Sequence, residues 1–167
     1  MMKFLRLAVC AAVAGCAAYD VSRTVTPGMA QGEVSALAGK PIAEGRLADN
    51  KAYWDYTRQP YGYTIYRVTF GPDERVREVR NLLTPENIRK LQAGMTQAEV
   101  SALVGASSEP RAYANGTRSW SYRYQDYGVI KLLHVIFDSG DRVLWYYSEW
   151  DPRVYSKKGG GGSGGGR

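Results

Sequence analysis

Residues 28–39 read GMAQGEVSALAG, and residues 94–105 read GMTQAEVSALVG. The two stretches are identical at nine of twelve positions, at a constant offset of 66. Self-similarity at one fixed offset is the signature of a repeated supersecondary unit, and chance or low complexity rarely produces it over this length. We therefore expect two tandem units, at residues 22–82 and 83–155.

Three shorter motifs repeat downstream of these stretches. They are Trp-x-Tyr at 54–56 and 120–122, Val-x-Phe at 68–70 and 135–137, and Arg-Val at 75–76 and 142–143. The first recurs at an offset of 66 and the other two at 67, so one residue is inserted between them. The join between the halves has no long Gly/Ser linker, so we expect the units to pack closely.

Each unit is predicted to begin with a helical pair. In the second unit, Thr84 is a suitable N-cap for a short helix. Thr96 and Glu99 then form a capping box at the start of the repeated stretch. In the first unit Ala30 replaces the capping threonine, which weakens that helix start.

Strand patterns follow the helices in both units. Alternating or continuous apolar runs bounded by Gly, Pro and Asp turns predict strands at 53–58, 63–70 and 76–80, and at 118–124, 129–137 and 142–150. Short turns between consecutive strands indicate antiparallel hairpins. The expected fold class is therefore α+β, with each unit a helical pair packed on a three-stranded antiparallel meander.

The composition is that of a packed fold, with hydrophobic residues at 44% and charged residues at 23% of the chain. Tyr and Trp, at 13 and 4, outnumber the 3 Phe, which favours surfaces that are both apolar and wettable. The formal charge of +6 falls to +4 once Lys3 and Arg6 are removed with the leader described next. No run of five like charges remains, so we expect no nucleic-acid partner.

The N-terminus has the layout of a secretory signal. Lys3 and Arg6 precede an apolar segment at 7–14 that is too short to span a bilayer. Ala-Val-Ala at 12–14 could serve as an ordinary cleavage site. Val-Ala-Gly-Cys at 13–16 resembles the bacterial lipobox, which implies removal of residues 1–15, lipidation of Cys16 and a tether over 16–21. Cys10 lies in the leader, so no disulfide is possible within the mature chain.

The repeated pattern resembles a known family. Gly-Met-Thr-x-x-Glu-Val-x-x-Leu-x-Gly, then Trp-x-Tyr, Val-x-Phe and Arg-Val, is similar to the BamE family, also called SmpA/OmlA domain lipoproteins. The resemblance runs from Val25 to about Tyr147, twice over, whereas the family's assembly factor carries one unit. Tandem units of this shape also resemble the β-lactamase inhibitor protein, whose paired sheets form a concave partner-binding surface.

The sequence predicts neither an enzyme nor a metal or cofactor site. Its single histidine, His134, lies in the strand expected at 129–137, with no nucleophile or carboxylate in a recognisable arrangement. No Cys/His metal spacing and no phosphate-cradling loop is present. We interpret His134 as a sheet-face residue.

One face of each sheet is the candidate partner-binding surface. Because Val68 and Phe70 recur in both units, their face is assigned to the core. The opposite faces carry a candidate protein-binding set, Tyr63, Ile65, Arg67, Ile130, Leu132, His134 and Ile136. Alternatively, the two sheets cover each other or form one continuous sheet.

The resemblance implies a function. It implies a non-enzymatic lipoprotein, held by Cys16 in the inner leaflet of the outer membrane, facing the periplasm and serving as a scaffold or accessory factor in β-barrel protein assembly. Ala17 after the cysteine favours outer-membrane sorting. The alternative is a periplasmic inhibitor or envelope stress factor that binds an exported enzyme. The Gly-rich tail at 156–167 has no core potential and is excluded from the fold.

Overall fold

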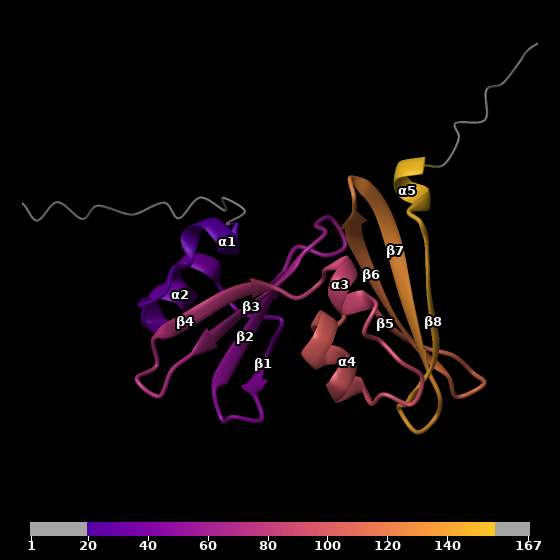
Figure 1. Cartoon of the computed structure of the whole chain (residues 1–167), viewed down its shortest axis with the longest axis horizontal. Coiled ribbons are helices and arrows are strands. Elements are labelled where there is room, and N and C mark those ends of the chain that lie inside the picture. The colour runs from indigo at the N-terminus through magenta and orange to yellow at the C-terminus, as the bar shows by residue number, and fades with distance from the viewer. Residues whose placement is uncertain (1–19, 156–167) are drawn as a thin grey trace, which may run out of the picture.

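The computed structural model describes residues 20–155 (Figure 1). The predicted signal peptide, the lipidation site Cys16 and the Gly-rich tail lie outside these residues. The first unit contains, in order, α1 (Val21–Thr24), α2 (Gln31–Ala38), β1 (Ala43–Arg46), β2 (Ala52–Thr57), β3 (Ile65–Phe70) and β4 (Val76–Asn81). No helix in the described part of the chain is long and apolar enough to cross a membrane.

The second unit follows the same order and adds a short final helix. It contains α3 (Pro85–Ile88), α4 (Gln97–Val104), β5 (Pro110–Ala112), β6 (Arg118–Asp126), β7 (Val129–Phe137), β8 (Val143–Trp150) and α5 (Pro152–Tyr155). The strands form two separate antiparallel sheets, ordered β1-β2-β3-β4 and β5-β6-β7-β8. The predicted α+β class is confirmed, and the continuous sheet is excluded.

Each sheet has four strands, so the prediction of three-stranded meanders is wrong. The additional strands β1 and β5 pair with β2 and β6 at the sheet edges. Their sequences, AEGR and PRA, show no apolar alternation and are largely exposed. Backbone pairing rather than side-chain burial defines such short edge strands, so a search for hydrophobic periodicity does not detect them.

The helix starts follow their capping residues. Thr96 Oγ1 accepts the Glu99 amide at 3.3 Å. Glu99 Oε2 accepts the Thr96 amide at 2.8 Å, which completes the predicted capping box. At α2 only one half of the box remains, because Glu33 Oε2 accepts the Ala30 amide at 2.7 Å and alanine offers no oxygen in return.

Equivalent contacts attach the helices to the sheets in both units. The φ angles of Gly28 and Gly94 are 93° and 85°, a region that glycine adopts without strain. Their amides donate to the carbonyls of Val76 at 2.8 Å and Val143 at 2.7 Å. These contacts place α2 and α4 over the inner faces of their own sheets.

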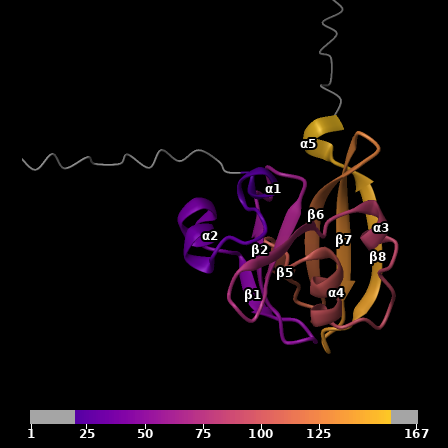
Figure 2. The ribbon, with the colours of Figure 1, turned by 60° about the vertical axis from the view of Figure 1, so that its left-hand side comes forward.

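Each unit has its own apolar core, and one residue of the first unit joins the core of the second. The first core centres on Val34, Val68 and Phe70, and the second on Val100, Val135 and Phe137. Ile65, on the opposite face of the first sheet, belongs to the second core. Helix α4 lies between the two sheets (Figure 1, Figure 2), so it covers the inner face of its own sheet and the outer face of the preceding one.

Candidate protein-docking site on the outer sheet faces

The outer face of the first sheet is covered by α4. Ile65, predicted to bind a partner, is fully buried there. It lies so close to Gly105, which ends α4, that a Cβ atom added to that glycine would be 2.5 Å from Ile65 Cγ2. Ile65 therefore packs against the second unit, and an external partner does not reach it in this structure.

Arg67 is buried on the same face, where polar contacts hold its side chain. It is 2% exposed, and its guanidinium binds both carboxylate oxygens of Asp55 at 2.7 Å. It also donates to the carbonyls of Ser101 at 3.1 Å and Ala102 at 3.5 Å. A cation is favourable at these carbonyls because they belong to the C-terminal half of α4. Arg67 thus joins the two units, and the helix layer, not the second sheet, covers this face.

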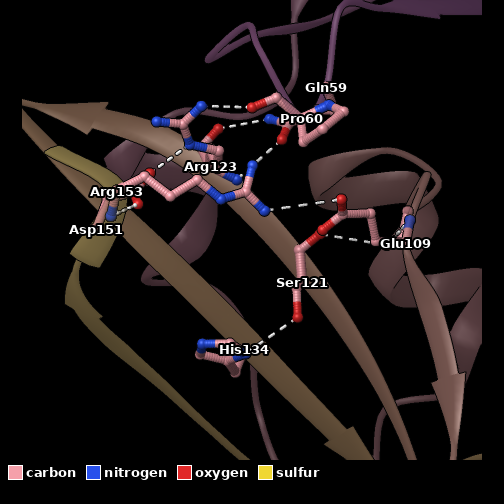
Figure 3. A network of polar contacts seen from close by, with 9 residues as sticks. Gln59, Pro60, Glu109, Ser121, Arg123, His134, Asp151 and Arg153 are labelled. Carbon is pink, nitrogen blue, oxygen red and sulfur yellow. Dashed lines mark hydrogen bonds and ion pairs between the residues drawn. The ribbon is translucent and has the colours of Figure 1, made fainter.

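Tyr63, the third predicted residue of the first unit, lies at the junction of the units. Its half-buried ring is 5.2 Å from the guanidinium of Arg123 in β6. Arg123 forms a buried ion pair with Asp151 and donates to the carbonyl of Pro60 (Figure 3). The Arg123 amide donates to Gln59 Oε1 at 3.0 Å. The sequence gives no sign of this junction, because its members are distant in the chain and meet only when the units dock.

The outer face of the second sheet, by contrast, is open. Leu132, His134 and Ile136 of β7 are partly exposed there, while Ile130 is 9% exposed and nearly buried. On the neighbouring strand β8, Trp145 pairs with Ile136 and Tyr147 with His134, and their exposed fractions are 53% and 47%. We call the surface formed by Leu132, His134, Ile136, Trp145 and Tyr147 the open face.

His134 is the polar centre of the open face. Its Nδ1 lies 3.0 Å from Ser121 Oγ, and its Nε2 lies 3.2 Å from Glu149 Oε1. Its ring stacks on Tyr147 with centroids 4.9 Å apart. The sequence shows no nucleophile or carboxylate in a recognisable arrangement with His134, and it is cross-strand register that brings Ser121 and Glu149 to its ring.

The hydroxyl, imidazole and carboxylate form a hydrogen-bonded row on this face. Nucleophilic hydrolases also need amide donors aimed at a developing oxyanion in a water-excluded site. β7 is an interior strand whose amides are engaged by β6 and β8, and Glu149 is 52% exposed. The set therefore offers hydrogen-bond donors and acceptors to a docked surface. Between residues 20 and 155, no group of three or more His, Cys, Asp or Glu is placed to hold a metal ion.

Two buried tyrosines donate hydrogen bonds at the C-terminal ends of the repeated helices. Tyr56 donates to the carbonyl of Gly39 at 3.3 Å, and Tyr122 donates to that of Gly105 at 3.0 Å. Burial, with a smaller contribution from Glu44, raises the pKa of Tyr56 to about 12. Burial, followed by the charge of Asp55, raises the pKa of Tyr122 well above its usual value. Both hydroxyls therefore stay protonated at neutral pH and act as donors.

The comparisons with known proteins find a family similarity in the second unit. Residues 80–147 match the family described as "Outer membrane protein assembly factor BamE domain". This confirms the resemblance to the BamE family for the second unit. Residues 22–79 lie outside the match, so the tandem arrangement stays a prediction. No curated protein matches the chain.

Two solved structures show some similarity. A putative osmotically inducible lipoprotein, OsmE, is 20% identical with a TM-score of 0.35, over 41% of this chain and 73% of its own. A DUF4309 family protein, YjgB, from Bacillus subtilis subsp. subtilis str. 168, is 17% identical with a TM-score of 0.30, over 73% of this chain and 78% of its own. At these scores neither similarity carries an argument about function.

Proposed function

We propose that this protein is a non-enzymatic lipoprotein of the outer membrane, facing the periplasm, that acts as an accessory factor in the assembly of β-barrel membrane proteins. The BamE-family domain at 80–147 supports a role in outer-membrane protein assembly or a related envelope function. The lipobox-like sequence ending at Cys16 supports a lipid anchor. Its acyl chains would contribute roughly 0.8 kcal/mol per buried methylene.

The open face is the observation that supports a binding role. It combines partly exposed aliphatic side chains with two exposed aromatic rings, a composition typical of protein interfaces. The corresponding face of the first sheet is covered within the chain, so only the second sheet offers this surface outward. The protein-binding role predicted from sequence is therefore proposed for Leu132, His134 and Ile136, with Trp145 and Tyr147 added.

We also propose that the chain consists of two copies of one domain. Besides the sequence repeat, both units contain an edge-to-face Trp–Phe pair on the inner face of the sheet, at 4.8 Å for Trp54 and Phe70 and at 5.0 Å for Trp120 and Phe137. Both also bond an arginine to the glycine before the repeated helix. The first copy would then act chiefly as a rigid support for the second.

The function is tested by affinity purification from detergent-solubilised membranes. The wild-type chain is compared with Ile136→Asp, which places a carboxylate on the open face, and with Ile42→Asp, at an isoleucine that is 43% exposed in the first unit. We expect components of the barrel-assembly machinery with the wild type and with Ile42→Asp, and their loss with Ile136→Asp. Equal recovery with all three would contradict the proposal, and recovery of a single periplasmic hydrolase would favour an inhibitor.

A further inference from the structure

The contact between α4 and the first sheet has two halves. The helix offers the carbonyls of Ser101 and Ala102, together with the close approach that Gly105 permits. The sheet offers the Arg67 guanidinium as a donor and Ile65 as the apolar surface beneath the helix end. Each half has a counterpart elsewhere that makes no such contact within residues 20–155.

The helical half recurs in α2. This helix reads QGEVSALA where α4 reads QAEVSALV, and Ser35 and Gly39 occupy the positions of Ser101 and Gly105. Ser35 and Gly39 are exposed, whereas Ser101 is half-buried and Gly105 is buried against the first sheet. Gly39 and Gly105 end their helices with similar φ values, 73° and 87°. The surface that α4 uses for docking is thus repeated on α2, where no other part of the described chain covers it.

The sheet half recurs on the open face. At an offset of 67, Leu132 stands in the place of Ile65 and His134 in the place of Arg67. Arg67 pairs across the strands with its acceptor Asp55, and His134 pairs in the same way with Ser121. The open face therefore has, like the covered face, an apolar side chain beside a nitrogen-bearing side chain that a neighbouring strand holds in place. Both His134 nitrogens already have partners, Ser121 and Glu149, so a docked helix carbonyl would take the place of one of them.

α2 and the open face differ from α4 and the covered face by added charges of opposite sign. Lys40 follows Gly39, where the uncharged Ala106 follows Gly105, so the end of α2 carries an added cation. On the open face, His134 has the half-exposed carboxylate of Glu149 beside it. An added cation on the helix and an added anion on the sheet are complementary, and they favour this pairing over one between like surfaces.

We infer that the open face binds α2 of a second copy of this chain. The contact is heterologous, because the helix of one copy meets the sheet of the next, so copies associate head to tail into chains or rings. This inference rests on the proposed function in one respect, that the open face is a protein-docking surface. It names a further occupant of that surface, and such self-association would compete with any other partner there.

Two variants test the two halves separately. Ser35→Arg places a long charged side chain on the free surface of α2, and His134→Glu replaces the donor with an anion that the helix carbonyls repel. The full chain, purified in detergent, is studied by light scattering with the detergent mass subtracted. We expect the wild type to grow in mass with concentration and each variant alone to be monomeric. An equimolar mixture of the two variants retains one intact helix and one intact open face, so it forms dimers and nothing larger.

The exposed Ala48, in the turn between β1 and β2, provides matched controls. Ala48→Arg and Ala48→Glu introduce the same side chains away from both halves, and they are expected to assemble like the wild type. Restoration of dimers on mixing also shows that both variants are folded. A monomeric wild type, assembly by either single variant, or a mixture that stays monomeric would each overturn the inference.

The outcomes also separate this inference from the proposed function. A monomeric wild type whose envelope partner is lost with Ile136→Asp would leave the function standing and remove self-association. A wild type that assembles as described but recovers no envelope component would leave self-association standing and contradict the proposed function.

Discussion

Arg67 and Asp55 form a bidentate ion pair between neighbouring strands of the first sheet, and Arg67 also binds α4 of the second unit. The side chains are 3% and 0% exposed, and the same guanidinium donates to the Ser101 carbonyl of α4. A buried pair of this kind adds little net stability compared with apolar residues, but its geometry is demanding. Its role here is to fix how α4 sits on the first sheet, and therefore how the second unit is oriented.

Removing one partner of this pair is expected to destabilise the protein strongly. Asp55→Ala leaves Arg67 buried without its counter-charge, which typically costs about 3–5 kcal/mol in the free energy of unfolding. The double variant Asp55→Ala/Arg67→Met removes both charges and should lose less than the sum of the single changes. Urea denaturation of the wild type, Asp55→Ala, Arg67→Met and the double variant measures the coupling energy between the two side chains.

The exposed ion pair between Glu86 and Lys90 is the control for this measurement. Glu86→Ala should leave the denaturation midpoint almost unchanged, since solvent screens such pairs. Strict additivity of the Asp55 and Arg67 changes would show that the pair does not act as a unit.

Alanine substitutions at two equivalent glycines distinguish the cost of backbone strain from the cost of a clash between the units. Gly39 and Gly105 both have positive φ. Their ψ angles are −154° and 170°, a region that essentially only glycine adopts, so alanine costs roughly 1–3 kcal/mol there, and this strain is common to Gly39→Ala and Gly105→Ala. A Cβ at Gly39 meets nothing within 4 Å, whereas one at Gly105 meets Ile65 at 2.5 Å. Gly105→Ala should therefore destabilise by about 1–3 kcal/mol more than Gly39→Ala, as measured by urea denaturation.

Shortening Ile65 tests the cause of that difference. In Ile65→Ala, Cγ2 and Cδ1 are gone and only Cβ, at 3.3 Å, remains near the new Cβ, so Gly105→Ala should cost little more than Gly39→Ala in this background. If the excess cost of Gly105→Ala persists when Ile65 is alanine, the contact between the units does not explain it.

The extent to which sequence predicted this fold depends on how local each signal is. The six predicted strands lie within two positions of their observed bounds, since alternation and turn residues act over a few positions. β1 and β5 were missed because their side chains are mostly exposed. The repeat revealed both helices that the docking argument uses, α2 and α4, although it could not show that α4 covers the preceding sheet.

The candidate site was predicted only where it depends on strand alternation. Leu132, His134 and Ile136 do share one face, as period-two alternation requires. Ile65 and Arg67 share the equivalent face, but docking of the second unit buries them, and strand alternation contains no information on docking. Ser121 and Glu149 reach His134 through strand register, which depends on pairing across the whole sheet.

The missing cap of α2 predicts a stabilising substitution. Ala30→Thr supplies the hydroxyl that Thr96 provides at α4, where it accepts the Glu99 amide at 3.3 Å. Glu33 already supplies the other half of the capping box, so the new cap should stabilise by about 1 kcal/mol. Thr96→Ala should destabilise by a similar amount. Thermal unfolding of both variants measures the effect, and an unchanged midpoint for Ala30→Thr would show that the helix start is already satisfied.

The buried tyrosines predict a loss of stability at alkaline pH. In the folded protein burial raises the pKa of Tyr56 to about 12, above the ordinary value of 10.0 that applies to the unfolded chain. The unfolded chain therefore gives up its proton first as the pH rises. The folded state binds more protons between these values, and the free energy of unfolding must fall across this range. Below about pH 10 the contribution is fully present.

Urea denaturation at a series of pH values, from neutral to strongly alkaline, tests this in three variants. Tyr56→Phe and Tyr122→Phe should each flatten the alkaline decline, because phenylalanine has no proton to release. They also lose the bonds to Gly39 and Gly105, so their curves should start lower at neutral pH and converge on the wild type as the pH rises. Tyr127→Phe, at a side chain that is 97% exposed, is the control and should follow the wild type throughout. If the two buried-site variants decline as steeply as the wild type, ionisation of these tyrosines does not cause the alkaline unfolding.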